Sequence, residues 1–314
     1  MIKIKYPENL FDFISSYVEI FDLVGLQEGW KDYKRKYNLQ NANFSVTDML
    51  YGNFDFLLEK SLNIVYDTSD YNSSNKVKLY KLKKIFDYDK YQPKIADFFM
   101  KYENEMKLSS CYYCNIDFIN AFSTRNRNNK LSFKNHFTLD HVIDKATNPI
   151  VALSLFNFVP SCYSCNSKFK KSDQFTKVVA DKYKSPTDAE FNFNEDVKLK
   201  VLYTRGKNSL NINSIDDFEI NFDDSKHLYE DYIKIFKLKE RYRFHKNIAL
   251  ELLTKKKNYS DSRVDEISRI IGMPKEEIKK DLFGKEIFEG ELQEKPFTKL
   301  KRDIYVRKIY DDTL

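Results

Sequence analysis

Apolar positions in the first 108 residues repeat with the spacing of amphipathic helices. The two clearest runs are Leu10, Phe13, Ile14, Tyr17, Val18 and Phe21, and then Ile95, Phe98, Phe99, Tyr102 and Met106. Pro93 stands just before the second run, where a proline suits the first turn of a helix. The polar stretch 66–76 predicts a loop. Residues 1–108 are therefore predicted to be a helical N-terminal region.

The pattern changes between residues 109 and 175, where the apolar periods become shorter. Residues 135–142 alternate like a strand, and 156–160 predict a second short strand that ends at Pro160. The polar, basic residues 122–132 predict an exposed excursion, and residues 162–172 have the length of a short helix. This order predicts a small strand, strand and helix region.

The remaining residues, 176–314, begin with two possible strands and then return to a helical pattern near Ser225. Pro274 is expected to open one of these helices and Gly284 to close it. The last stretch, 295–308, is basic and amphipathic. The predicted fold class is therefore α+β and mostly helical, with a small central finger between helical N- and C-terminal regions.

Composition supports a folded protein of this kind. The chain has 314 residues, of which 42% are hydrophobic and 16% aromatic, enough for a sizeable core. It contains no apolar run of the length needed to cross a bilayer, and its N-terminus lacks the pattern of a signal peptide. We therefore expect a cytoplasmic protein without membrane contact. The net charge of +6 is compatible with a polyanionic partner but does not establish one.

All four cysteines belong to two C-x-x-C pairs, Cys111/Cys114 and Cys162/Cys165. Four thiolates complete the tetrahedral shell of a structural zinc ion, and paired C-x-x-C motifs are a common way to supply them. Chance cysteines and a redox pair are the alternatives. A closed four-sulfur site has no open position, so any catalytic chemistry must come from the segment between the two pairs.

That segment, together with the residue directly after the second pair, contains polar residues that suit phosphodiester hydrolysis. Asp140 and the amide oxygen of Asn166 are ligands of the kind that Mg²⁺ or Mn²⁺ prefers. His141 has the chemistry of a general base that removes a proton from an attacking water. Asn157 lies between them in the sequence, at the edge of the second predicted strand.

The order C-x-x-C, Asp-His, Asn and C-x-x-C-Asn-x-Lys resembles the HNH endonucleases with a ββα-metal finger braced by four cysteines. The resemblance covers about residues 109–172. It implies that Asp140 and Asn166 bind the catalytic metal, that His141 activates water, and that Asn157 holds the loop that orients the histidine. It also implies a metal-dependent endonuclease acting on DNA, of the kind found in bacterial antiviral defence or restriction.

The chain departs from this family in one residue and raises one geometric question. Asp144 stands where the family often has proline, either as a neutral loop change or as an extra carboxylate near the metal. Asp140 and His141 are adjacent, and adjacent side chains of a strand point to opposite faces. The two residues are expected to share one site only if the strand twists or ends there.

Basic residues near this segment are candidate contacts to the nucleic-acid backbone. Lys170 follows Asn166 by one helical turn, so we expect it to reach a phosphate near the cleaved bond. A solvated basic loop is the alternative for those before the first predicted strand. The candidates are Lys168, Lys170, Lys171, Arg125 and Arg127.

Two further functions stay open at this stage. The chain could be a zinc-braced nucleic-acid-binding protein without catalysis, or a protein whose helical flanks bind a partner. DNA is the expected substrate, with RNA as an alternative. A second copy of the chain or a partner ATPase is a candidate ligand of the flanks.

Overall fold

The computed structural model describes residues 1–39, 42–63, 73–125, 129, 131–171 and 185–306. Contacts divide the chain into two compact units. The site unit comprises Lys3–Leu108 and Ile119–Phe191, and the C-terminal unit comprises Met1–Ile2, Ser109–Phe118 and Asn192–Leu314. The N-terminal helices thus share a unit with most of the central region, whereas residues 109–118 group with the C-terminal part of the chain.

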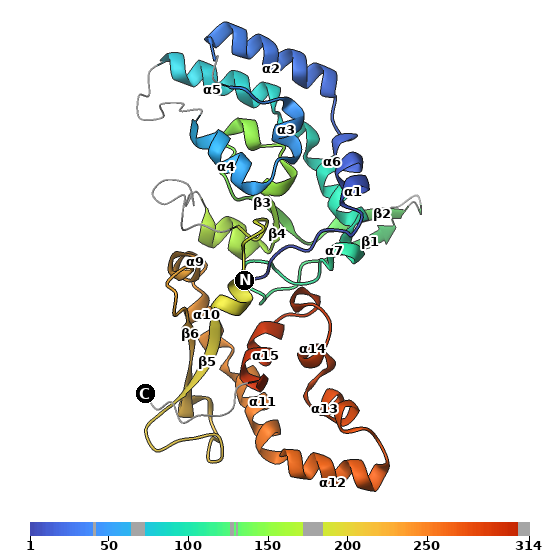
Figure 1. The fold of residues 1–314 in the computed structure, drawn as a ribbon, viewed down its shortest axis with the longest axis vertical. Coiled ribbons are helices and arrows are strands. Elements are labelled where there is room, and N and C mark those ends of the chain that lie inside the picture. The colour runs from blue at the N-terminus through green and yellow to red at the C-terminus, as the bar shows by residue number, and fades with distance from the viewer. Residues whose placement is uncertain (40–41, 64–72, 126–128, 130, 172–184, 307–314) are drawn as a thin grey trace. The chain divides into compact units, whose positions relative to one another are not determined.

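The site unit begins with a set of helices, as the apolar pattern predicts. α1 starts where the side chain of Asn9 accepts a hydrogen bond from Asp12 N, and it buries Phe13 and Tyr17. α2 and α5 lie side by side (Figure 1). The helices are α1 (Leu10–Val18), α2 (Leu23–Tyr37), α3 (Val46–Tyr51), α4 (Phe54–Asn63), α5 (Ser73–Ile85), α6 (Tyr88–Lys101) and α7 (Glu103–Met106). Of the loop expected over 66–76, residues 66–72 lie outside the described residues, and residues 73–76 are instead the first turn of α5.

α6 begins earlier than the sequence pattern indicates. The side chain of Asp87 accepts a hydrogen bond from Lys90 N, so the helix starts at Tyr88 and Pro93 lies inside it. The prediction that Pro93 occupies the first turn is therefore wrong. The capping side chain of Asp87 determines where the helix starts. The helix continues through Pro93 to Lys101 although proline has no N–H to donate.

Two short hairpins follow α7 in the chain. β1 (Ala121–Arg125) pairs antiparallel with β2 (Leu131–Asn135), and β3 (Thr138–His141) pairs antiparallel with β4 (Phe158–Ser161). Pro160 does not end the second strand as predicted, because β4 runs on to Ser161. In a two-stranded sheet, a proline is tolerated where the missing N–H faces away from the partner strand.

The connection between β3 and β4 is held by the N-terminal helices. The hydroxyl of Tyr17 donates to the carbonyl of Leu153 over 2.8 Å, and the hydroxyl of Ser154 donates to the carbonyl of Met49. Two 3₁₀ turns, η1 (Pro149–Val151) and η2 (Leu155–Asn157), lie in this connection. Hydrogen bonds to α1 and to α3 therefore hold the two residues that follow Ala152.

A seven-residue π-helical segment, η3 (Ser164–Lys170), follows β4. It takes the place of the short helix that the sequence predicts. A π-helix has more residues per turn than an α-helix, and such segments are frequent at functional sites.

The C-terminal unit combines one hairpin with a set of helices (Figure 1). β5 (Lys198–Tyr203) and β6 (Phe218–Asp223) form the predicted strands, paired from Lys198 with Asp223 to Tyr203 with Phe218. The prediction for the helix between Pro274 and Gly284 is confirmed: it spans Lys275–Phe283 with these two residues as its caps. The elements are α8 (Phe193–Asp196), η4 (Ile215–Asp217), α9 (Glu230–Ile235), α10 (Leu238–Phe244), α11 (Lys246–Asn258), α12 (Asp261–Ile271), α13 (Lys275–Phe283), α14 (Lys285–Phe288), η5 (Leu292–Glu294) and α15 (Thr298–Val306).

Candidate active site and cysteine cluster

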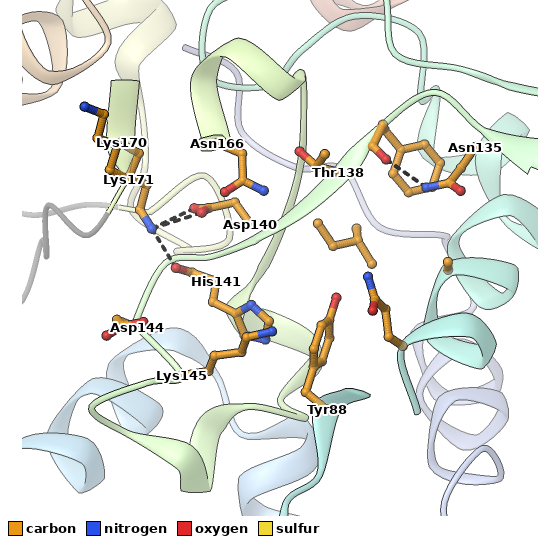
Figure 2. Close-up of a pocket in the computed structure, with 14 residues that line it drawn as sticks. Tyr88, Asn135, Thr138, Asp140, His141, Asp144, Lys145, Asn166, Lys170 and Lys171 are labelled. Carbon is orange, nitrogen blue, oxygen red and sulfur yellow. Dashed lines mark hydrogen bonds and ion pairs between the residues drawn. The ribbon is translucent and has the colours of Figure 1, made fainter. Parts of the chain in front are cut away.

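Asp140 and His141 are the last two residues of β3, opposite Val159 and Phe158 of β4. Because the strand ends at His141, the alternation of side chains between faces is not continued there. Both residues line one cavity of about 350 Å³ within the site unit (Figure 2). The end of the strand therefore answers the question of how two adjacent side chains reach the same cavity.

The buried ring of His141 is fixed by its neighbours. Its Nε2 lies 3.0 Å from the carbonyl oxygen of Ala152, and the rings of Tyr88 and Phe158 pack edge-on at 4.6 and 4.8 Å between centroids. A carbonyl oxygen only accepts, so Nε2 carries the proton and the lone pair of the neutral ring lies on Nδ1. None of the described residues is a hydrogen-bond partner of Nδ1.

Burial, and after it the positive charge of Lys145, lowers the pKa of His141 to about 3. The imidazole is therefore neutral at physiological pH. A neutral imidazole with a free Nδ1 is the form that accepts a proton.

Asn157 stabilises the loop that carries the Ala152 carbonyl. Its fully buried carboxamide accepts from Ile143 N over 2.7 Å and donates to the carbonyls of Ile143 and Val151 over 2.9 and 3.1 Å. Every polar atom of this amide is thereby used within the loop. Asn157 does not line the cavity, so it acts on the site through the backbone.

Asp140 is held by an ion pair. The ammonium of Lys170 lies 3.0 Å from each carboxylate oxygen of Asp140 and 2.7 Å from the carbonyl oxygen of His141. Both side chains are 4% exposed. This differs from the expected contact between Lys170 and a phosphate, because the ammonium is already bound by protein oxygens inside the unit.

Asn166 lies on η3, and its side chain points toward Asp140 (Figure 2). It is partly exposed, and no described residue is a hydrogen-bond partner of its carboxamide. The amide oxygen is thus free to bind a ligand beside the carboxylate of Asp140. One carboxylate and one amide oxygen on a polar cavity wall fit a hard cation that keeps water and phosphate as its other ligands.

The cavity also has a wall that the sequence did not reveal. Tyr88 and Gln92 of α6 line it, together with Lys145 from the loop after β3. Burial raises the pKa of Tyr88 to about 12, so its hydroxyl stays protonated. Lys145 follows His141 by four residues, a local signal that could have been noticed. Nothing in the local pattern connects Tyr88 with a strand more than forty residues later.

Asp144, the third residue after His141, also lines the cavity. Its carboxylate accepts from Ala146 N and from the amide and hydroxyl of Thr147. These bonds within its own turn make Asp144 a loop-stabilising residue in this structure.

The four cysteines Cys111, Cys114, Cys162 and Cys165 form a cluster of buried thiol groups that are not joined by disulfide bonds. Their sulfur atoms lie within 4.8 Å of one another. Zinc–sulfur bonds of about 2.3 Å in a tetrahedron place sulfurs about 3.8 Å apart, so the cluster has the dimensions of a site for an ion such as zinc.

Polar groups surround two of these sulfurs. Ile116 N donates to Cys114 Sγ, and Cys165 N donates to Cys162 Sγ, each over 3.4 Å. The guanidinium of Arg241 lies 3.4 Å from Cys114 Sγ and 3.0 Å from a carboxylate oxygen of Asp117. Such donors stabilise thiolates rather than neutral thiols.

Asn115 follows Cys114 just as Asn166 follows Cys165, but the structure gives it a different role. It is fully buried, and its Nδ2 donates to Ser110 Oγ and to the carbonyls of Leu292 and Lys295. Its Oδ1 accepts from Lys299 N. The same pentapeptide pattern thus yields a structural asparagine in one pair and a cavity-lining one in the other.

The other residues that the sequence predicts as nucleic-acid contacts lie in different parts of the site unit. Lys168 and Lys171 are exposed, and Lys171 lines the cavity rim. Arg125 is exposed at the end of β1 and donates to Asn129. Arg127 lies outside the described residues.

Comparisons with known proteins do not add a relative: no family model, curated protein or solved structure matches this chain. Across the part of the chain that is described, every helix is too short or too polar to span a bilayer.

Proposed function

We propose that this chain is a metal-dependent endonuclease of the HNH type, which hydrolyses phosphodiester bonds of DNA. The observation that carries the proposal is the meeting of Asp140, His141 and Asn166 on the wall of one polar cavity. A carboxylate, an amide oxygen and a neutral imidazole are the groups that such hydrolysis needs. The four-cysteine cluster, holding zinc, would be its structural metal site.

In this proposal each cavity residue has its own role in hydrolysis. His141 Nδ1 takes the proton of the attacking water, because Nε2 is committed to Ala152. Asp140 and Asn166 would hold the catalytic ion through their oxygens. Bound there, Mg²⁺ or Mn²⁺ supplies charge stabilisation for the leaving oxygen. Lys170 keeps the carboxylate of Asp140 in place.

A nicking assay tests this function. Supercoiled plasmid is incubated with the full chain in Mg²⁺ or Mn²⁺ and compared with His141→Ala and with Lys90→Ala, a change of an exposed residue of α6 that does not line the cavity. Loss of the base should lower the rate by about 100-fold or more, whereas Lys90→Ala should keep most of it. Cleavage that persists unchanged in His141→Ala would remove this histidine from the mechanism.

A zinc-braced nucleic-acid-binding protein without catalysis is the second candidate. The free carboxamide of Asn166 beside a buried carboxylate argues against it, since binding alone does not require that pair. Retention of a labelled duplex without any cleavage in either metal ion would favour it. A role in bacterial defence or restriction rests on the family resemblance alone.

A further inference from the structure

Lys145 is a cation of the cavity without a counter-charge in contact. Three lysines line the cavity, but Lys170 is bound to Asp140 and Lys171 lies exposed at the rim. Lys145 is half-buried, and its ammonium lies 3.6 Å from the centroid of the Tyr88 ring. Within the described part of the chain, no residue forms a hydrogen bond or ion pair with it.

A half-buried ammonium in this position favours an anionic ligand. Removing a charge from water is unfavourable unless an opposite charge compensates, and an aromatic ring compensates only in part. The carboxylates of Asp89 and Asp144 act on Lys145 from beyond contact distance, and that of Asp144 is engaged by its own turn. The cavity therefore presents a cation whose best partner would come from outside the protein.

Tyr88 determines where that cation lies relative to the base. One ring face holds the ammonium of Lys145, and the same ring packs edge-on against His141. Both contacts are made by one rigid, buried side chain of α6. The spacing between the imidazole and the ammonium is consequently built into the site unit.

We infer that Lys145 binds a backbone phosphate of the nucleic acid and so positions it against Asp140 and His141. This inference rests on the proposed function, which brings a phosphodiester into the cavity. It assigns the phosphate contact to Lys145 in place of Lys170, whose ammonium is occupied. Tyr88 is then a positioning residue for both groups.

Binding of a labelled 20-base-pair duplex by the full chain tests the inference, with Ca²⁺ replacing Mg²⁺ so that cleavage is suppressed. Affinity is measured by anisotropy at several salt concentrations for wild type, Lys145→Met and Lys145→Arg. The control is Lys90→Met, because Lys90 is exposed on α6 with its ammonium 4.8 Å from the Tyr91 ring and does not line the cavity.

Lys145→Met should bind about tenfold more weakly, and its slope of log affinity against log salt should fall by about 0.9, the value for one phosphate contact. Lys145→Arg and Lys90→Met should keep the wild-type slope. Thermal midpoints show whether each variant is folded, and a variant that unfolds is replaced by Lys145→Gln.

Equal slopes for wild type and Lys145→Met would overturn the inference, as would an equal loss in Lys90→Met. Inorganic phosphate serves as a second probe: if it protects the wild type against heat as strongly as the duplex does, Lys145 belongs to a small-anion site instead. Failure of the proposed function is recognised separately, because a chain that binds through Lys145 but never nicks plasmid would refute hydrolysis alone.

Discussion

Replacing Lys170 by methionine would leave the buried carboxylate of Asp140 without its partner. The two side chains are 4% exposed, and the ammonium is held by both carboxylate oxygens and by the carbonyl of His141. Breaking a buried ion pair by removing one partner costs about 3–5 kcal/mol, whereas removing both partners is often neutral. We therefore expect Lys170→Met to destabilise the protein far more than the double change Lys170→Met with Asp140→Leu.

The size of the effect can be set against a surface ion pair in the same unit. Lys60 pairs with Glu59 where the two side chains are 26% and 60% exposed, so Lys60→Met should cost about 1 kcal/mol or less. A loss of about 3 kcal/mol in Lys170→Met corresponds to a fall of roughly 6–12 °C in the thermal midpoint of a unit of this size.

The assay is thermal unfolding followed by circular dichroism, with zinc supplied to all samples. The order expected is wild type and Lys60→Met highest, the double variant lower or equal, and Lys170→Met lowest. If Lys170→Met melts within 2 °C of Lys60→Met, the carboxylate finds compensation elsewhere, and the account of this ion pair is wrong.

Three other expectations come from single contacts. Asn157→Leu should lower the free energy of unfolding by about 3 kcal/mol, because it leaves the amide of Ile143 and nearby carbonyls unpaired in the interior. Urea unfolding measures this loss, and a value under about 1 kcal/mol would contradict the expectation. Arg241→Met, loaded with zinc, should release the ion to a chelating dye faster than the control Arg243→Met, whose exposed side chain pairs with Glu219. Equal release rates would show that the guanidinium of Arg241 does not protect the Cys114 thiolate. Burial by itself raises the pKa of Glu286, but the hydrogen bond and positive charge of Lys301, with a smaller contribution from Lys295, lower it from the ordinary value of 4.5 to about 2. The stabilising effect of the carboxylate should therefore be complete above pH 4.5 and disappear as the pH falls toward 2. Glu286→Gln should be less stable than wild type by about 1 kcal/mol at neutral pH, and the difference between their thermal midpoints should shrink over that pH range. A difference that does not depend on pH would refute the role given to the Glu286 carboxylate.

Sequence patterns were informative where the chemistry is local. Helix limits marked by Pro274 and Gly284 depend on backbone preferences of those residues, and the structure has them as predicted. Two C-x-x-C pairs indicated a four-sulfur cluster, because few other arrangements use all the cysteines of a chain. Asp140, His141 and Asn166 could be grouped from motif order, and the structure places them on one cavity.

The features that could not be predicted depend on contacts between distant segments. Lys170 follows Asn166 on a π-helical segment and binds Asp140, whereas the sequence pattern predicts an ordinary helical turn and a contact with phosphate. Tyr88 reaches the cavity because α6 packs against the β3–β4 hairpin, which no local pattern encodes. Similar motifs can also take different roles, since Asn115 and Asn166 each follow a C-x-x-C pair but have different neighbours.

The packing of Tyr88 of α6 on His141 bears on any attempt to isolate the candidate site as a fragment. A fragment limited to residues 109–175 would contain both cysteine pairs, Asp140, His141 and Asn166, but it would lack the ring that packs against the imidazole. A fragment that keeps the position of His141 therefore has to include α6, and a shorter one should leave this imidazole free to change its orientation.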